Sequence, residues 1–212
     1  MTNDGLIINL EGSGCTGKTT AIAVIADRLR DMGYDPTVVT NHVIDDYTQS
    51  LRDTLSHFGA NVSELSKACV YAAIWTRIQE QIIEPARAAN KIVLLDRWSA
   101  TTYFFQAAAT EYKIRDIFSS VELTKTDLCL HLMCSDMDII EQRLANRHDR
   151  KDRYNNEFIR KSLVYMPEYI RGCQATSHKR VGIDTSHINI ETVVDQCMEQ
   201  IFPLLEGIPH AE

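Results

Sequence analysis

The sequence has no stretch that is long and apolar enough to cross a bilayer, since no run approaches ~18 uninterrupted apolar residues. Residues 1–5 carry no basic segment, and the apolar run after them is too short for the core of a secretory signal. We therefore expect a soluble, cytoplasmic protein with no membrane partner.

The cysteines and histidines lack the spacings of a metal site. None of the six cysteines forms a C-x-x-C pair, and the seven histidines contain no H-E-x-x-H sequence. These absences argue against a dedicated zinc site and against a disulfide framework. We expect free thiols, as in a reducing compartment.

An excess of positive charge is also missing. The chain has 22 Lys and Arg against 29 Asp and Glu, a formal net charge of −7. Stable binding to a nucleic-acid backbone needs a basic surface, so we expect no nucleic-acid partner. A local basic pocket for one nucleotide stays compatible with this charge. The length of 212 residues fits one core, and we expect a single domain over residues 1–212.

Residues 12–19 read GSGCTGKT and fit the pattern G-x-x-x-x-G-K-[ST] at every fixed position. They follow the apolar run 6–10 and precede the helical pattern 21–26, which is the strand–loop–helix context that the motif requires. Backbone N–H groups of such a loop cradle phosphates, the lysine neutralises them and the next hydroxyl holds Mg²⁺. The motif predicts an ATP and Mg²⁺ site formed by Gly12, Ser13, Gly14, Cys15, Thr16, Gly17, Lys18, Thr19 and Thr20.

Strand and helix patterns alternate along the chain. Strands separated by helices imply a parallel sheet covered on both faces. We expect a three-layer α/β P-loop NTPase fold with five parallel strands, and ligands at the carboxyl edge of the sheet. The predicted strands are 6–10, 36–40, 91–96, 127–132 and 180–184. The helices predicted after the first one are 47–58, 63–89, 99–110, 137–146, one that starts at about 154, and 190–205. Pro85 is expected to bend the end of the helix over 63–89.

Asp96 and Arg97 end the most clearly apolar strand. An acid in this position can orient Mg²⁺ beside Thr19, and the alternative is that Asp96 or Ser99 caps the following helix. Arg97 has a donor fork that suits a phosphate on the second substrate, and its alternative is a surface ion pair. We expect Asp96 to serve the metal and Arg97 the acceptor phosphate.

A basic segment stands out in this acidic chain. Residues 143–153 contain four arginines and a lysine. Such a run is typical of a solvated loop. It also fits a lid, about residues 146–156, that closes over phosphates, stabilises the transferring group and excludes water. We expect the lid, with Arg147, Arg150 and Arg153 as catalytic candidates.

These segments together resemble the thymidylate kinases, which phosphorylate dTMP with ATP. The resemblance covers essentially the whole chain and is carried by residues 10–20, 71–73, 83–86, 91–98 with Gln106, 153–154 and 183–186. It implies a homodimer.

The same resemblance implies a substrate pocket. Tyr71 falls where the family places an aromatic residue that stacks on thymine. Thr101, Thr102 and Gln106 fall where side chains line the base pocket, and Tyr154 where a tyrosine packs near the deoxyribose. Lys18 and Thr19 would bind ATP phosphates and Mg²⁺, as the loop motif already indicates.

Three positions depart from the family pattern, all on the acceptor side. Gly14 replaces an aspartate that binds the sugar, residues 40–43 read TNHV instead of Thr-Arg-Glu-Pro, and Trp75 replaces an arginine that contacts the base. Trp75 would bring a large apolar face to the substrate. Since Cys15 stands where some members have a basic residue, the lid should supply that charge.

The expected reaction is therefore ATP-dependent phosphorylation of a pyrimidine deoxynucleoside 5′-monophosphate, dTMP to dTDP. The departures leave a second interpretation, a kinase for a modified or other deoxynucleotide or for a deoxynucleoside. A third is a non-catalytic nucleotide-binding regulator, against which Arg97 and the arginine-rich segment argue.

Overall fold

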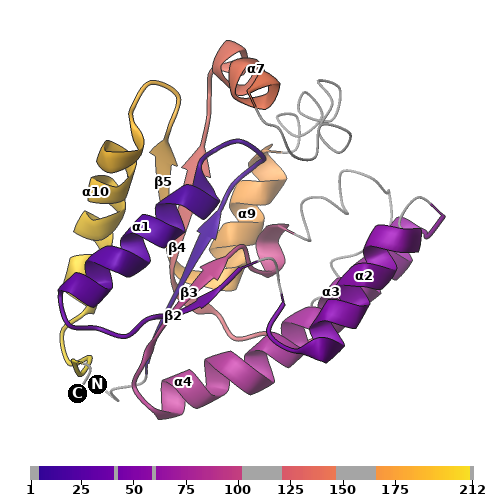
Figure 1. Cartoon of the computed structure of the whole chain (residues 1–212), viewed down its shortest axis with the longest axis horizontal. Coiled ribbons are helices and arrows are strands. Elements are labelled where there is room, and N and C mark those ends of the chain that lie inside the picture. Colours follow the sequence, from indigo (N-terminus) through magenta and orange to yellow (C-terminus); the bar gives the residue numbers. More distant parts are fainter. Residues whose placement is uncertain (1–4, 41–42, 59–60, 102–120, 147–165, 211–212) are drawn as a thin grey trace.

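The computed structural model describes residues 5–40, 43–58, 61–101, 121–146 and 166–210. Within them lies one sheet of five strands in the order β2-β3-β1-β4-β5, with every neighbouring pair parallel (Figure 1). This confirms the predicted α/β class and its five-stranded parallel sheet. The strands are β1 Leu6–Glu11, β2 Thr37–Val39, β3 Ile92–Asp96, β4 Thr126–Met133 and β5 Ser177–Asp184.

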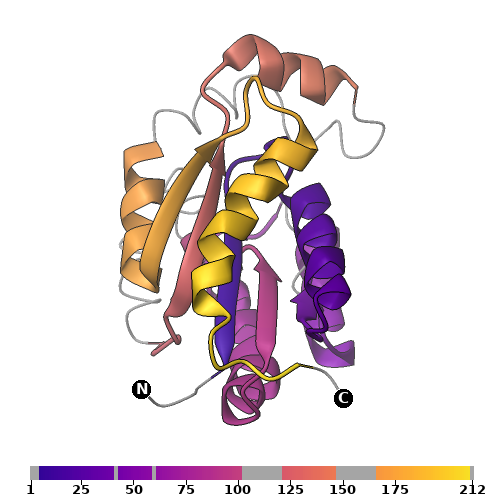
Figure 2. The same cartoon turned by 90° about the vertical axis from the view of Figure 1, so that its left-hand side faces the viewer.

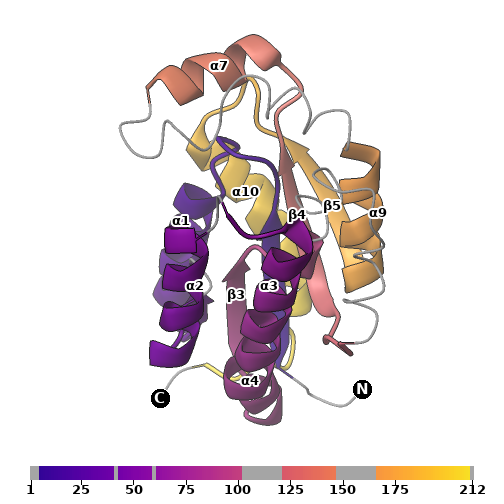
Figure 3. The same cartoon turned by 90° about the vertical axis from the view of Figure 1, so that its right-hand side faces the viewer.

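Helices cover both faces of the sheet. Helices α1 and α10 pack on one face, while α3 and α9 lie on the other (Figures 2 and 3). No helix of the described residues is long and apolar enough to span a membrane. The helices are α1 Lys18–Asp31, α2 Asp46–Phe58, α3 Glu64–Ile78, α4 Glu84–Ala88, α7 Met137–Ala145, α9 Met166–Thr176 and α10 Ile190–Ile201.

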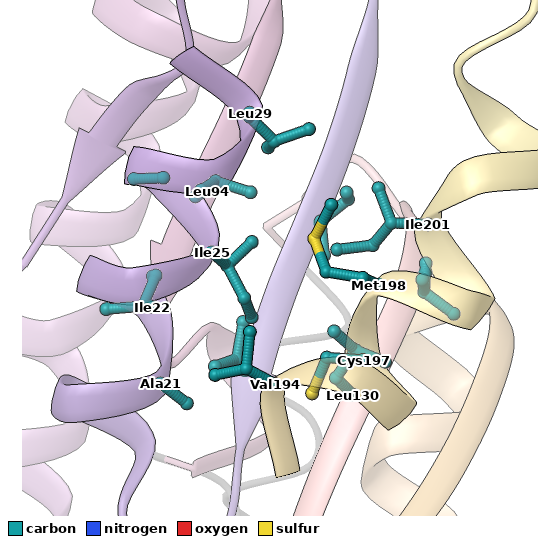
Figure 4. Packing of buried hydrophobic residues seen from close by; sticks show 14 of the residues in the cluster. Ala21, Ile22, Ile25, Leu29, Leu94, Leu130, Val194, Cys197, Met198 and Ile201 are labelled. Carbon is teal, nitrogen blue, oxygen red and sulfur yellow. The ribbon is translucent and has the colours of Figure 1, made fainter. Parts of the chain in front are cut away.

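The larger apolar core lies between the sheet and the pair α1 and α10 (Figure 4). Helix α1 turns Ile22, Ile25 and Leu29 into it at helical spacing, and α10 contributes Val194 and Ile201. Each fully buried side chain of this kind stabilises the fold by roughly 1.5–3 kcal/mol. This packing fixes where α1 begins, and hence where the phosphate loop before it lies.

The helix predicted over 63–89 contains a local change of winding. After α3, the π-helical turn Gln79–Ile83 leads into α4, and Pro85 lies in the first turn of α4. A proline has no N–H for the usual bond to the carbonyl four residues earlier. The wider π turn accommodates this, so the proline follows an irregular turn instead of bending the end of a regular helix.

Two further boundaries differ from the predictions. Strand β5 begins at Ser177 instead of residue 180, because the polar residues at its start still pair with β4. Helix α10 ends at Ile201 and continues as the 3₁₀ turn Phe202–Leu204, which contains Pro203. The predicted helix over 99–110 begins at Ser99, and residues 102–110 and 147–156, with most of the predicted lid, lie outside the described residues.

The loop between β1 and α1 depends on two glycines in left-handed backbone regions. Gly12 has φ 147° and Gly17, the N-cap of α1, has φ 85°. A Cβ on Gly12 would collide with the carbonyl oxygen of Leu132 on β4, whereas a Cβ on Gly17 would meet nothing within 4 Å. Gly12 is therefore required both by its backbone conformation and by close approach to β4.

We predict that Gly12→Ala lowers the free energy of unfolding by roughly 3 kcal/mol, because it adds a backbone collision to conformational strain. Gly17→Ala is the matched control and should cost about 1 kcal/mol, from strain alone. Urea unfolding of the nucleotide-free proteins measures both. Equal losses for the two variants would contradict the packing explanation.

His131 is a fully buried histidine in the middle of β4. Arg180 of β5 donates from Nη2 to its Nδ1 at 2.7 Å, and because a guanidinium can only donate, the ring proton is on Nε2. Burial, and then the positive charges of Arg180 and Lys18, lower the pKa of His131 to about 3. The imidazole therefore stays neutral in the folded protein at pH values where the unfolded chain protonates it.

This difference predicts acid sensitivity. Between its unfolded pKa of about 6.5 and its folded pKa of about 3, the unfolded state binds one more proton, so stability is lost as the pH falls. His131→Gln should make the free energy of unfolding depend less steeply on pH by up to about 1.4 kcal/mol per pH unit. Urea unfolding between about pH 4.5 and 6.5 measures the slope. The control His178→Gln changes an exposed histidine of β5 and should leave the slope as it is.

Candidate active site

The carboxyl ends of β1 and β3 bring the predicted phosphate loop and the Asp96-Arg97 pair together. Leu10 of β1 is the register partner of Asp96 in β3, and the N–H of Arg97 donates to the carbonyl of Leu10 at 2.9 Å. In the loop, Ser13 and Thr16 are buried, while the neighbouring Gly14 and Cys15 are half-buried and Thr19 and Thr20, in the first turn of α1, are exposed.

Lys18 lies folded against the phosphate loop with only 5% of its surface exposed. Its Nζ donates to the carbonyl of Ser13 at 2.5 Å and to Oγ1 of Thr16 at 3.2 Å. Burial, and then Arg97, lower the pKa of Lys18 well below its usual value, while Asp96 and Glu11 act in the opposite direction. A bound anion would favour the charged lysine, so this environment suits phosphate groups.

Thr19 and Asp96 meet as the loop motif predicted. The Thr19 hydroxyl donates to Oδ2 of Asp96 at 2.8 Å. The other oxygen, Oδ1, is buried and has no hydrogen-bond partner among the described residues. A carboxylate oxygen with open acceptor capacity beside a hydroxyl fits Mg²⁺, which prefers such hard oxygen ligands. The alternative role of Asp96 as a helix cap does not form in the described residues, because Oδ2 accepts from Thr19 and Oδ1 accepts no backbone N–H.

The remaining ligands of such an ion would have to come from elsewhere. No group of three His, Cys, Asp or Glu side chains gathers as a metal site in the described part of the chain. Mg²⁺ commonly binds through one or two protein oxygens, with substrate phosphates and water completing its coordination. The pair of Thr19 and Asp96 matches that kind of site.

Arg97 has a left-handed backbone, with φ 77°. Its Nη1 donates to the carbonyl of Gly12 at 2.8 Å and to Oγ1 of Thr101 at 3.1 Å. The guanidinium of Arg97 therefore lies on the phosphate loop, on the same side as Lys18 and Asp96. Such a planar donor group can bind two oxygens of one phosphate.

Two residues of this site escaped the sequence-based assignment. Arg143 of α7 donates from Nη1 to the carbonyl of Cys15 at 3.3 Å and from Nη2 to the carbonyl of Thr185 at 2.5 Å, so it links the phosphate loop to the loop after β5. Arg143 lies within the helix predicted over 137–146 and before the predicted lid, so it was not among the catalytic candidates. The other is Glu11, whose signal was an acid ending an apolar strand directly before the glycine loop.

The predicted substrate residues divide into different environments. Tyr71 on α3 is half-buried, and its hydroxyl accepts a hydrogen bond from Arg52 of α2 at 3.3 Å. Trp75 is fully buried and packs edge-on against Trp98, with ring centroids 5.0 Å apart. Its predicted apolar face is used in the core and offers no surface to a nucleotide in this structure.

Thr101 is also buried, with 5% of its surface exposed, between Arg97 and Glu11. The partners of its hydroxyl in this structure include these two side chains. The other candidates, Thr102, Gln106, Arg147, Arg150, Arg153 and Tyr154, lie outside the described residues.

Comparison with known proteins places this arrangement in a family. Residues 10–196 match the protein-family model described as thymidylate kinase. The thymidylate kinase of Latilactobacillus sakei subsp. sakei (strain 23K) is 29% identical over 210 residues, covering 93% of this chain and 94% of that protein. That of Thermoanaerobacter sp. (strain X514) is 26% identical over 161 residues, covering 74% and 79%. The family match spans most of the sequence, and the chain therefore belongs to the thymidylate kinase family of phosphotransferases.

Proposed function

We propose that this chain transfers the γ-phosphoryl group of Mg·ATP to the 5′-phosphate of dTMP, giving dTDP and ADP. The observation that carries the proposal is the contact of Thr19 with Asp96, beside the buried Lys18 and the guanidinium of Arg97. The relatives named thymidylate kinases support dTMP as the acceptor.

On the donor side, the loop N–H groups and Lys18 would hold the ATP phosphates. Thr19 and Asp96 would hold Mg²⁺, which would neutralise charge on the phosphates when bound. Lys18 is already enclosed by the loop, so its charge acts in a site where water screens it little.

On the acceptor side, Arg97 would hold the 5′-phosphate of dTMP and Tyr71 would stack on thymine. Phosphoryl transfer leaves the protein little covalent chemistry, and catalysis comes from alignment and charge stabilisation. The side chains of Arg97 and Lys18 both donate to carbonyls of the phosphate loop, those of Gly12 and Ser13, which suits an in-line approach of acceptor to donor. The predicted roles of Thr102, Gln106 and Tyr154 at the nucleoside, and of Arg147, Arg150 and Arg153 in a lid, belong to this proposal.

The proposal also includes a homodimer and a cytoplasmic location, since the reaction consumes ATP. Tyr47 on α2 and Leu65 on α3 expose 52% and 44% of their surface, and the two helices pack side by side (Figure 3). Single exposed apolar side chains are common on protein surfaces, so the homodimer is proposed from membership of the family. Light scattering of the purified protein measures the oligomeric state.

We predict that Lys18→Ala lowers turnover at least about a hundredfold, because it removes the charge that would neutralise the ATP phosphates during transfer. The nucleotide-free variant should keep its melting temperature, since burial of this ammonium is unfavourable. The control Lys91→Ala removes an exposed lysine before β3, at the opposite edge of the sheet, and should leave turnover unchanged. Turnover of Lys18→Ala near that of the unmodified protein would refute the donor site.

The acceptor is tested by turnover with dTMP, dUMP, dCMP and thymidine. We expect dTMP to give the highest kcat/KM, exceeding dUMP by about tenfold or more, since one methyl group in an apolar pocket discriminates to that extent. Gly14 and the sequence 40–43 motivate the second candidate, a kinase for another deoxynucleotide or a deoxynucleoside. A higher kcat/KM with any other acceptor would favour that candidate, and no turnover with any acceptor would favour a nucleotide-binding regulator.

A further inference from the structure

Glu11 ends β1, and its carboxylate is fully buried. Its Oε1 accepts the N–H of Trp98 at 2.7 Å and the side-chain amide of Asn9 at 3.2 Å. Its Oε2 accepts the hydroxyl of Thr101. A buried carboxylate is tolerated only when its oxygens are hydrogen-bonded, and the segment that follows β3 provides two of these bonds.

Thr101 links this buried acid to Arg97. A hydroxyl has one proton to donate, and an ionised carboxylate can only accept. The hydroxyl of Thr101 therefore donates its hydrogen bond to Glu11. The same oxygen, Oγ1, accepts a hydrogen bond from Nη1 of Arg97 at 3.1 Å. The hydrogen bonds run in one direction, from Arg97 to Thr101 and from Thr101 to Glu11.

The same strand end holds the backbone of Arg97. Its φ of 77° is a conformation that residues other than glycine usually avoid, so the surrounding structure has to impose it. The carbonyl of Leu10 accepts its N–H at 2.9 Å, and Glu11 binds the next N–H, that of Trp98. The carbonyl of Gly12 accepts from the guanidinium at 2.8 Å. Backbone and side chain are thus both held by the end of β1 and the loop after it.

We infer that Glu11 and Thr101 are positioning residues that aim the guanidinium of Arg97 at the acceptor phosphate. The inference rests on the proposed role of Arg97 as the group that binds that phosphate. An arginine held in place before its ligand arrives loses less side-chain freedom on binding, so its affinity for the phosphate is higher. The bonds to Thr101 and to Gly12 fix its direction.

The main test is Thr101→Val, which keeps the shape of the side chain and removes the hydroxyl. We expect KM for dTMP to rise about tenfold, the size of one hydrogen bond to a charged group. KM for ATP and the inhibition constant of thymidine should each change less than about twofold, because neither depends on a phosphate held by Arg97. Thr101→Ser keeps the hydroxyl and should return KM for dTMP to within about twofold of the original value.

Ser99→Ala is the matched control. Ser99 lies in the same helical turn and is buried, but its hydroxyl has no hydrogen-bond partner among the described residues. Its removal should leave KM for dTMP and for ATP unchanged. Glu11→Gln is the second test variant, which also decides the question if Thr101→Val does not fold. It removes the anion that orients Thr101 and should raise KM for dTMP in the same selective way.

The variant Arg97→Ala tests the proposed role of Arg97 by itself, independently of the positioning role of Glu11 and Thr101. Calorimetry should show weaker dTMP binding in this variant. Adding Thr101→Val should weaken dTMP binding no further, because Thr101 acts on the phosphate only through Arg97. Unchanged dTMP affinity in Arg97→Ala would refute the proposed role of Arg97. A loss in Arg97→Ala together with an unchanged KM for dTMP in Thr101→Val would refute only the positioning role. Equal increases for dTMP, ATP and thymidine in Thr101→Val would also refute it.

Discussion

The register of β1 against β3 is the constraint on which the site depends, because it sets Leu10 opposite Asp96. Each strand reaches the same edge and ends in residues that bind phosphate or metal. A slip by one residue would turn Asp96 to the other face of the sheet and separate it from Thr19. The apolar packing of α1 and α10 on β1 and β3 holds this register, so the large core serves the site directly.

Two cationic and two acidic side chains meet where β1 and β3 end. Lys18 and Arg97 bring two positive charges, and Glu11 and Asp96 bring two carboxylates, with Glu11 fully buried and Lys18 and Asp96 nearly so. The pKa of Lys18 is nevertheless lowered well below its usual value, mainly because burial outweighs the two acids. A bound anionic substrate would offset this desolvation penalty, so phosphate binding would also stabilise the charged form of the lysine.

Local features of the sequence predicted much of this. The glycine loop could be recognised because its geometry depends on residues within one short segment, and strand–helix alternation gave the parallel sheet. The contact between Glu11 and Thr101 could not be predicted from the sequence, because the two residues are distant along the chain and only the fold brings them together. The burial of Trp75 could not be predicted for another reason. An aromatic residue gives the same sequence signal in a core as in a base pocket, and only packing against Trp98 distinguishes the two.

The π turn between α3 and α4 decides which side chains of this segment face the sheet. The fully buried Ile78 and Ile83 lie five positions apart, a spacing that a regular α-helix would place on different faces, since each residue turns the helix by about 100°. The wide turn absorbs one extra residue and returns the apolar face to the sheet. The irregular winding is confined to this single turn, so Ile78 before it and Ile83 at its end both pack into the same apolar cluster.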